Sequence, residues 1–124
     1  MRNAHFHLIL LVCCAHALVH IYELSLPSVE QQIADEYYEG DAASGKLLTG
    51  QMSNSWRFTW GFGALGAGWL VDRYGSRQML AVYLTGCGAL CIAVVWCQTT
   101  VSLFVVMLAM GAFASIYHPA GLAF

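Results

Sequence analysis

The feature that most constrains the fold of this chain is its series of apolar stretches, each near the length of about 20 residues that a helix needs to cross a bilayer. They lie at about residues 8–26, 45–71, 79–97 and 101–124, and the second becomes apolar enough to enter lipid from Met52. Because the bilayer core offers no partners to open backbone groups, such stretches fold as helices. The sequence therefore predicts an all-α integral membrane protein with four transmembrane helices that contact the lipid bilayer.

The composition supports this prediction and excludes several classes of function. Hydrophobic residues make up 59% of the chain and charged residues 10%, and the net charge of −2 gives no basic surface for nucleic acid. We expect neither an enzyme nor a cofactor, because no nucleophile and base pair or metal motif is visible. The cysteines form no C-x-x-C pair, and we interpret them as small packing residues: Cys13, Cys14, Cys87, Cys91 and Cys97.

The connections between the apolar stretches differ in charge. The first, at about 28–44, is acidic, whereas Arg73 and Arg77 in the connection at 72–78 fall on the same side as Arg2. By the positive-inside rule the N-terminus and the 72–78 loop are cytoplasmic, and the acidic loop is outside. Ser28 and Gln31 also have capping-box spacing, which predicts a short amphipathic helix at 28–37.

The connection expected in the cytoplasm contains a motif of glycines and charged residues, GWLVDRYGSR, at residues 68–77. Its Gly68 allows close approach of another backbone, and Gly75 gives the freedom to reverse the chain. Asp72 can accept hydrogen bonds or meet a helix N-terminus from elsewhere in the protein, and Arg73 and Arg77 hold the loop in the cytoplasm. The alternative is a simple hairpin turn whose charges only set the topology.

The spacing Gly68-x-x-x-Asp72-Arg73-x-Gly75-x-Arg77 resembles the loop between helices 2 and 3 of the major facilitator superfamily and departs from it at Ser76. This resemblance implies that the chain is part of the N-terminal six-helix bundle of a transporter of 12 helices, built from inverted three-helix repeats and working by alternating access. The expected location is the bacterial inner membrane. The missing C-terminal remainder would be a required partner, so we expect the fragment to be inactive alone.

The last residues of the chain resemble one branch of this family in particular. Gly111, Ser115, His118 and Pro119 lie in a pattern similar to one in the fosmidomycin-resistance-like branch of that family, although Met107 occupies a position where many antiporters carry arginine. Pro119 removes one backbone donor and frees the carbonyl of Ser115, which predicts a helix break at membrane depth.

The second helix has a face of small residues that is interrupted by Arg57. Small residues let membrane helices pack closely, so this face predicts contact with other protein or with a water-filled cavity. About 22 Å of helix separates Arg57 from Asp72, which places Arg57 in the outer part of the membrane. The alternative is that its side chain snorkels to the outer headgroups.

Three ionisable residues, His16, His20 and Glu23, share one face of the first helix. Such groups are expensive in lipid and are expected to face the protein interior. On the family pattern, His118 faces the same cavity. We consider three roles for this set: binding substrate or relaying protons, purely structural hydrogen bonding, and a metal or haem site, for which no third ligand is evident except Glu23.

The function predicted from these features is secondary active transport of a small solute, with possible proton coupling. The alternative is a non-transporting membrane subunit that packs against partner helices. The sequence leaves the substrate, the direction of transport and the coupling ion open.

Overall fold

The computed structural model describes residues 2–123, with the side chains of residues 5–123, and within them every regular element is a helix. The all-α prediction is therefore confirmed for this part of the chain. In order, the elements are α1 (Arg2–Ser28), α2 (Glu30–Tyr38), α3 (Ala42–Tyr74), α4 (Ser76–Ala93), the 3-10 turn η1 (Val94–Trp96), α5 (Thr100–Ala114) and α6 (Tyr117–Leu122).

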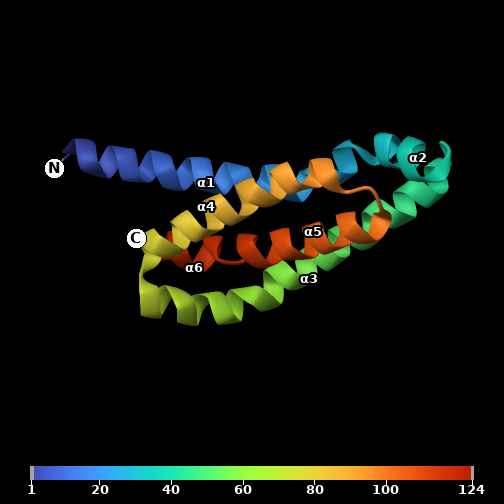
Figure 1. Cartoon of the computed structure of the whole chain (residues 1–124). Helices are drawn as coiled ribbons and strands as arrows, with labels where there is room; N and C mark the ends of the chain where they lie inside the picture. The colour runs from blue at the N-terminus through green and yellow to red at the C-terminus, as the bar shows by residue number, and fades with distance from the viewer. Residues whose placement is uncertain (1, 124) are drawn as a thin grey trace.

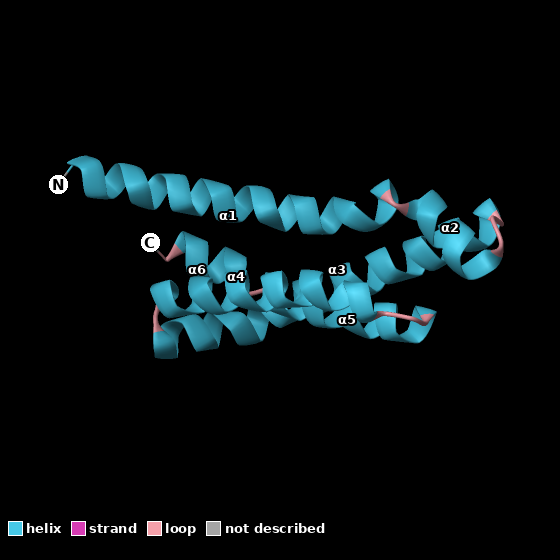
Figure 2. Ribbon diagram, turned by 45° about the horizontal axis from the view of Figure 1, so that its top comes forward, coloured by secondary structure: helices cyan, strands magenta, loops and turns pink. Residues whose placement is uncertain are grey.

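The long helices lie alongside one another in an elongated bundle, and successive ones run in opposite directions (Figure 1). The chain reverses through α2 at one end, through Gly75 at the other, and again between η1 and α5. Both ends of the described chain lie at the end of the bundle opposite α2, and α1 lies at its edge (Figure 2). This arrangement brings α1 beside both α3 and α6.

Three of the described helices are long and apolar enough to cross a membrane: His5–Ser28 in α1, Ser76–Trp96, and Thr100–Leu122. The helix α3 has 33 residues, the largest number of any element, but it is not among them. Polar residues such as Lys46, Asn54 and Arg57 are spread along its first half. Three of the four expected spans are thus long and apolar enough to cross a membrane, and the span expected at 45–71 remains a prediction.

The connection between α3 and α4 is shorter than the loop at 72–78 that we expected. Helix α3 continues through Tyr74 and α4 begins at Ser76, so Gly75 alone is not helical. Gly75 has φ of +85° and ψ of 148°, a conformation that side chains with a Cβ avoid. Its N–H donates to the carbonyl of Val71 at 2.8 Å, and its carbonyl accepts from Met79 at 3.2 Å. One glycine is therefore enough to reverse the chain.

The short helix that we expected at 28–37 exists as α2, but its cap differs from the predicted one. Helix α1 continues past Pro27 to Ser28, and the Ser28 hydroxyl donates back to Ser25 at 2.7 Å instead of capping α2. The N-cap of α2 is Val29, which makes no side-chain cap bond, and Gln31 donates to Asp35 at 2.9 Å. A proline in the last turn of a helix blocks its continuation only weakly, because few backbone bonds remain to be lost there.

Glycine sets how closely α5 packs on α3. A Cβ at Gly111 would meet the side chain of Thr59 and lie 2.5 Å from the backbone oxygen of Trp56, so these helices approach backbone to backbone. The close approach that we expected at Gly68 is not found within the described residues, since nothing lies within 4 Å of a Cβ built there. Within the described residues, the close approach of α3 to another backbone is thus made at Gly111 of α5 and not in the charged motif.

Candidate functional site

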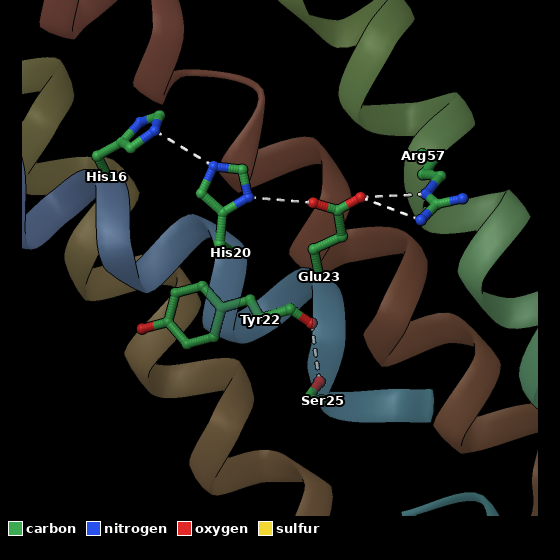
Figure 3. A network of polar contacts seen from close by, with 6 residues as sticks. All are labelled: His16, His20, Tyr22, Glu23, Ser25 and Arg57. Atoms are coloured by element: carbon green, nitrogen blue, oxygen red, sulfur yellow. Dashed lines mark hydrogen bonds and ion pairs between the residues drawn. The ribbon is translucent and has the colours of Figure 1, made fainter. Parts of the chain in front are cut away.

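The predicted polar face of α1 forms a continuous chain of contacts (Figure 3). His16 Nε2 lies 3.2 Å from His20 Nε2, and His20 Nδ1 lies 3.3 Å from Glu23 Oε2. The two imidazole rings meet edge to face with their centroids 4.7 Å apart. Spacings of four and three residues put all three side chains on one face of the helix, which is why the contacts form in sequence order.

Glu23 joins this chain to α3. Its Oε1 accepts from Arg57 Nε at 3.2 Å and from Nη2 at 3.1 Å, while its other oxygen faces His20. Figure 3 shows the guanidinium reaching across from α3 to the carboxylate on α1. The Arg57 side chain is 55% exposed and that of Glu23 is 21% exposed. The ion pair therefore links the edge helix to its neighbour and leaves the cation the more accessible partner.

The direction of the hydrogen bonds follows from the chemistry of the end group. An ionised carboxylate only accepts, so His20 donates from Nδ1. A neutral His20 then has an acceptor at Nε2, and His16 must donate from its own Nε2. When both imidazoles are neutral, His16 therefore carries its proton on Nε2 and His20 carries its proton on Nδ1. Hydrogen bonds are then donated from His16 to His20 and from His20 to Glu23.

The short helix α6 places two aromatic side chains against this network. Tyr117 lies 5.4 Å and His118 lies 6.3 Å from the His16 ring, measured between centroids, and His118 also contacts Trp60 of α3 at 5.1 Å. His118 thus meets His16 by ring contact, and no described hydrogen bond connects it to the chain. It stands beside the polar chain and is not a link in it.

The orientation of α6 follows from the interruption of the last span. The helical pattern breaks at Ser115 and Ile116, between α5 and α6, and resumes before Pro119. The ring of a proline clashes with the carbonyl four residues earlier, which is that of Ser115. Ser115 is buried, and its hydroxyl donates to Ala112 at 2.6 Å.

Two tyrosines that fix α1 were missed as site residues in the sequence analysis. Tyr83 of α4 is fully buried, and its hydroxyl donates to the carbonyl of Ala15 at 2.9 Å. Tyr117 donates to the carbonyl of Val12 at 3.3 Å. A tyrosine in an otherwise apolar spanning helix needs a partner for its hydroxyl, and that requirement was the available signal. Both bonds hold the backbone just before His16.

The charges of the motif GWLVDRYGSR lie away from this network, at the end of the bundle where α3 turns into α4 (Figure 1). Arg73 lies over the rings of Trp69 and Tyr74, at 5.5 Å and 5.7 Å from their centroids. Asp72 and Arg77 are exposed. The structure therefore separates the predicted residues into two groups, one along the length of the bundle and one at its end. In the first group His16, His20 and Arg57 are exposed, so the described helices do not bury this face as we expected.

The metal alternative has no support in the geometry of the described residues. Among them, no group of three or more His, Cys, Asp or Glu side chains is arranged to hold a metal ion. What the α1 network can do instead is hold and pass a proton, and present a guanidinium from α3.

A family model described as Major Facilitator Superfamily matches residues 2–124. Comparison with curated proteins and with solved structures found no match.

Proposed function

Because this chain belongs to the Major Facilitator Superfamily, a family of secondary transporters and not of enzymes, we propose that it forms the first four spans of a twelve-helix transporter that moves a small solute by alternating access. Its membership and its apolar helices make it an integral membrane protein. In the proposal the rest of the transporter faces the exposed side of α3 across a substrate cavity, and residues 1–124 alone do not transport.

The fourth span is supported by the path of the chain. If α1 and α4 both cross the membrane, α3 must cross it in the opposite direction, since it joins them and ends in a one-residue turn at Gly75. A helix of 33 residues is about 50 Å long, which exceeds the thickness of the hydrocarbon core. Large apolar side chains are also exposed along its second half: Phe58, Phe62, Leu65 and Trp69.

The proposed orientation has the N-terminus and the turn at Gly75 in the cytoplasm of a bacterium and α2 outside the inner membrane. It rests on the positive-inside rule. Single cysteines at Ser44 and Ser76, in a background without native cysteines, should react with an impermeant thiol reagent from opposite sides of the membrane. Labelling of both positions from outside would exclude this topology.

We propose further that transport is coupled to protons through α1. The observation that carries this proposal is the chain of contacts from His16 through His20 to Glu23, which ends on Arg57. Imidazole titrates near neutral pH and can accept a proton at one nitrogen while releasing another from the second. A network of this kind can hold a proton in one state of the transporter and release it in the other.

The experiment uses the full-length protein in proteoliposomes, with His20→Gln and Glu23→Gln. Glutamine keeps hydrogen-bonding capacity but does not titrate near neutral pH. Both variants should insert normally and lose or flatten the pH dependence of substrate flux. His5→Gln, the same change at an exposed position outside the network, should keep the wild-type profile.

The structural alternative makes a different forecast. If the histidines serve only folding, His20→Gln lowers the amount of folded protein and leaves the pH profile of the remainder unchanged. A wild-type profile in both network variants, at normal protein levels, would exclude proton coupling through α1.

A further inference from the structure

We propose that the solute is an organic monoanion with an apolar body, and that Arg57 binds its charged group when a proton reaches Glu23. This inference rests on the proposed function and names the substrate class of the same site. It follows from the charge balance of the network, from the exposure of its members and from the groove beside Arg57.

The network is electrically neutral at rest. Glu23 contributes one negative charge and Arg57 one positive charge, and both histidines can be neutral. One added proton leaves a net positive charge on a face of this chain where the His20 and Arg57 side chains are 52% and 55% exposed. In the proposed transporter that face lines a cavity between the two halves of the protein, where an unpaired charge is costly. An anion that arrives with the proton restores neutrality, so each favours the binding of the other, as linkage requires. A cationic solute bound at the same site would instead favour release of the added proton from the network.

The proton step can be written along the observed contacts. A proton binds His16 at Nδ1, the Nε2 proton of His16 passes to His20 Nε2, and the Nδ1 proton of His20 passes to Glu23 Oε2 over distances of 3.2 Å and 3.3 Å. One proton has entered, one carboxylate has become a neutral acid, and each imidazole ends as the other neutral tautomer. The ion pair with Arg57 is thereby weakened, because a neutral acid is a poorer acceptor.

Arg57 is placed to meet a ligand better than Glu23 is. Both of its bonds go to a single carboxylate oxygen, through Nε and Nη2, so this is not the two-oxygen pairing that saturates a guanidinium. Its side chain is more than half exposed, whereas the carboxylate lies behind it. The charge that the open face of α3 presents is therefore positive.

The surroundings of Arg57 indicate the rest of the ligand. A shallow, open groove of about 360 Å³, lined by residues of α3 alone, runs from Arg57 past Gly61, where no atom lies within 4 Å of a Cβ position. The other lining side chains are Phe58, Phe62 and Leu65. Arg57 is the only basic residue between Lys46 and Arg73 in the sequence. One cation beside an apolar, aromatic groove fits a single carboxylate on an aromatic or alkyl body.

Other groups that can titrate near the network are few in the described part of the chain. Tyr117 and His118 of α6 face His16, and Tyr83 of α4 bonds to the backbone of α1 just before it. Tyrosine stays neutral near physiological pH, so only His118 adds a second site for a proton. Protonation of His118 would also add positive charge, and it would strengthen the preference for an anion.

The test measures binding of three matched probes to the purified full-length protein by calorimetry, at about pH 5.5 and about pH 7.5, which bracket the titration of imidazole. The probes are benzoate, neutral benzamide and cationic benzylamine. We expect wild type to bind benzoate about tenfold more tightly at the lower pH, since one charge-assisted pairing is exchanged. Benzamide and benzylamine should bind weakly at both.

Two variants separate the roles of the ion pair and of the free cation. Glu23→Gln and Arg57→Gln both remove the ion pair, so effects that they share are structural. Glu23→Gln leaves Arg57 permanently available and should bind benzoate tightly at both pH values. Arg57→Gln should lose benzoate binding, and Arg57→Lys should recover part of it.

Tighter binding of benzylamine than of benzoate, unchanged benzoate binding in Arg57→Gln, or no benzoate binding in Glu23→Gln would overturn the inference. These outcomes are distinct from failure of the proposed function, because the pH dependence of flux is measured separately. A pH-dependent flux with preference for benzylamine would keep proton coupling and refute the monoanion. Benzoate binding that depends on Arg57, without pH-dependent flux, would keep the monoanion and refute proton coupling.

Discussion

Replacement of Gly111 by alanine tests whether the close packing of α5 on α3 sets the geometry of the site. The added methyl would lie 2.5 Å from the backbone oxygen of Trp56, where an ordinary contact is at least 3.4 Å. The helices must therefore separate by about 0.9 Å. Because the obstructing atom belongs to the backbone of a helix, no change of rotamer relieves the clash. Overpacking of this kind costs about 1–3 kcal/mol.

Gly88→Ala is the matched control. Gly88 lies within α4, and nothing lies within 4 Å of its Cβ position. The same substitution there meets no obstruction and should stabilise the helix by about 0.5–1 kcal/mol, because alanine loses less conformational freedom than glycine. Reversible unfolding of the full-length protein in mixed micelles gives both values. A Gly111→Ala variant as stable as Gly88→Ala would show that α5 does not contact α3 as described.

A second readout connects packing to the site. Displacement of α5 also moves α6, which carries Tyr117 and His118 to His16. Gly111→Ala should therefore reduce transport even in the fraction that remains folded. Gly88→Ala should keep wild-type transport.

Two further predictions concern single hydrogen bonds. Tyr83→Phe removes the bond to the carbonyl of Ala15 and should destabilise the protein by about 0.5–1.5 kcal/mol in an unfolding titration, whereas Tyr22→Phe, whose hydroxyl has no described bond, should cost less. Asp41 caps α3 by accepting from Ser44 at 2.6 Å and Ala43 at 3.1 Å, and these bonds lower the pKa of its carboxyl group. Since the folded pKa is the lower one, the cap is present above the unfolded value of about 3.9 and is lost as pH falls through the folded pKa. Amide exchange in the first turn of α3 should accelerate there in wild type but not in Asp41→Asn, which caps without titrating.

Much of the site could be predicted from sequence because it depends on local spacing. His16, His20 and Glu23 lie three and four residues apart, and any helix brings such positions onto one face. The reversal at Gly75 was likewise predictable, since a glycine between two long helices marks the position where an unusual φ is available. These features need no knowledge of how the helices pack.

The pairing of Glu23 with Arg57 was not predicted, because it depends on how α1 and α3 cross. The sequence analysis placed Arg57 in the outer part of the membrane, and Glu23 lies near the end of the 8–26 stretch, which is the outer end in the expected topology. Their similar depths and opposite charges were the signal available for joining them. The length of the 72–78 connection was overestimated for a related reason. Charged residues indicate that a segment lies in water, but they do not end a helix, and α3 continues through Asp72 and Arg73 to Tyr74.

Asp72 provides the last prediction, because the structure separates its local role from any distant one. Its side chain is exposed at the end of α3, and within the described residues it has no polar partner. Asp72→Asn keeps the size of the side chain and removes its charge. Stability of this part of the protein should therefore change by less than about 0.5 kcal/mol.

If Asp72 forms a state-specific contact with helices outside this chain, the same variant in the full-length protein should slow transport at normal expression, because an amide loses charge-assisted bonding. Arg77→Gln is the control, because it removes a charge at another exposed position across the same turn. If that charge serves only to set the topology, Arg77→Gln should change the thiol labelling of a single cysteine at Ser76 and should not slow flux in correctly inserted protein. Transport at the wild-type rate in Asp72→Asn would reduce the motif to a topological signal. A slowed rate with unchanged stability would require a partner for Asp72 beyond the described residues, since nothing within them is lost.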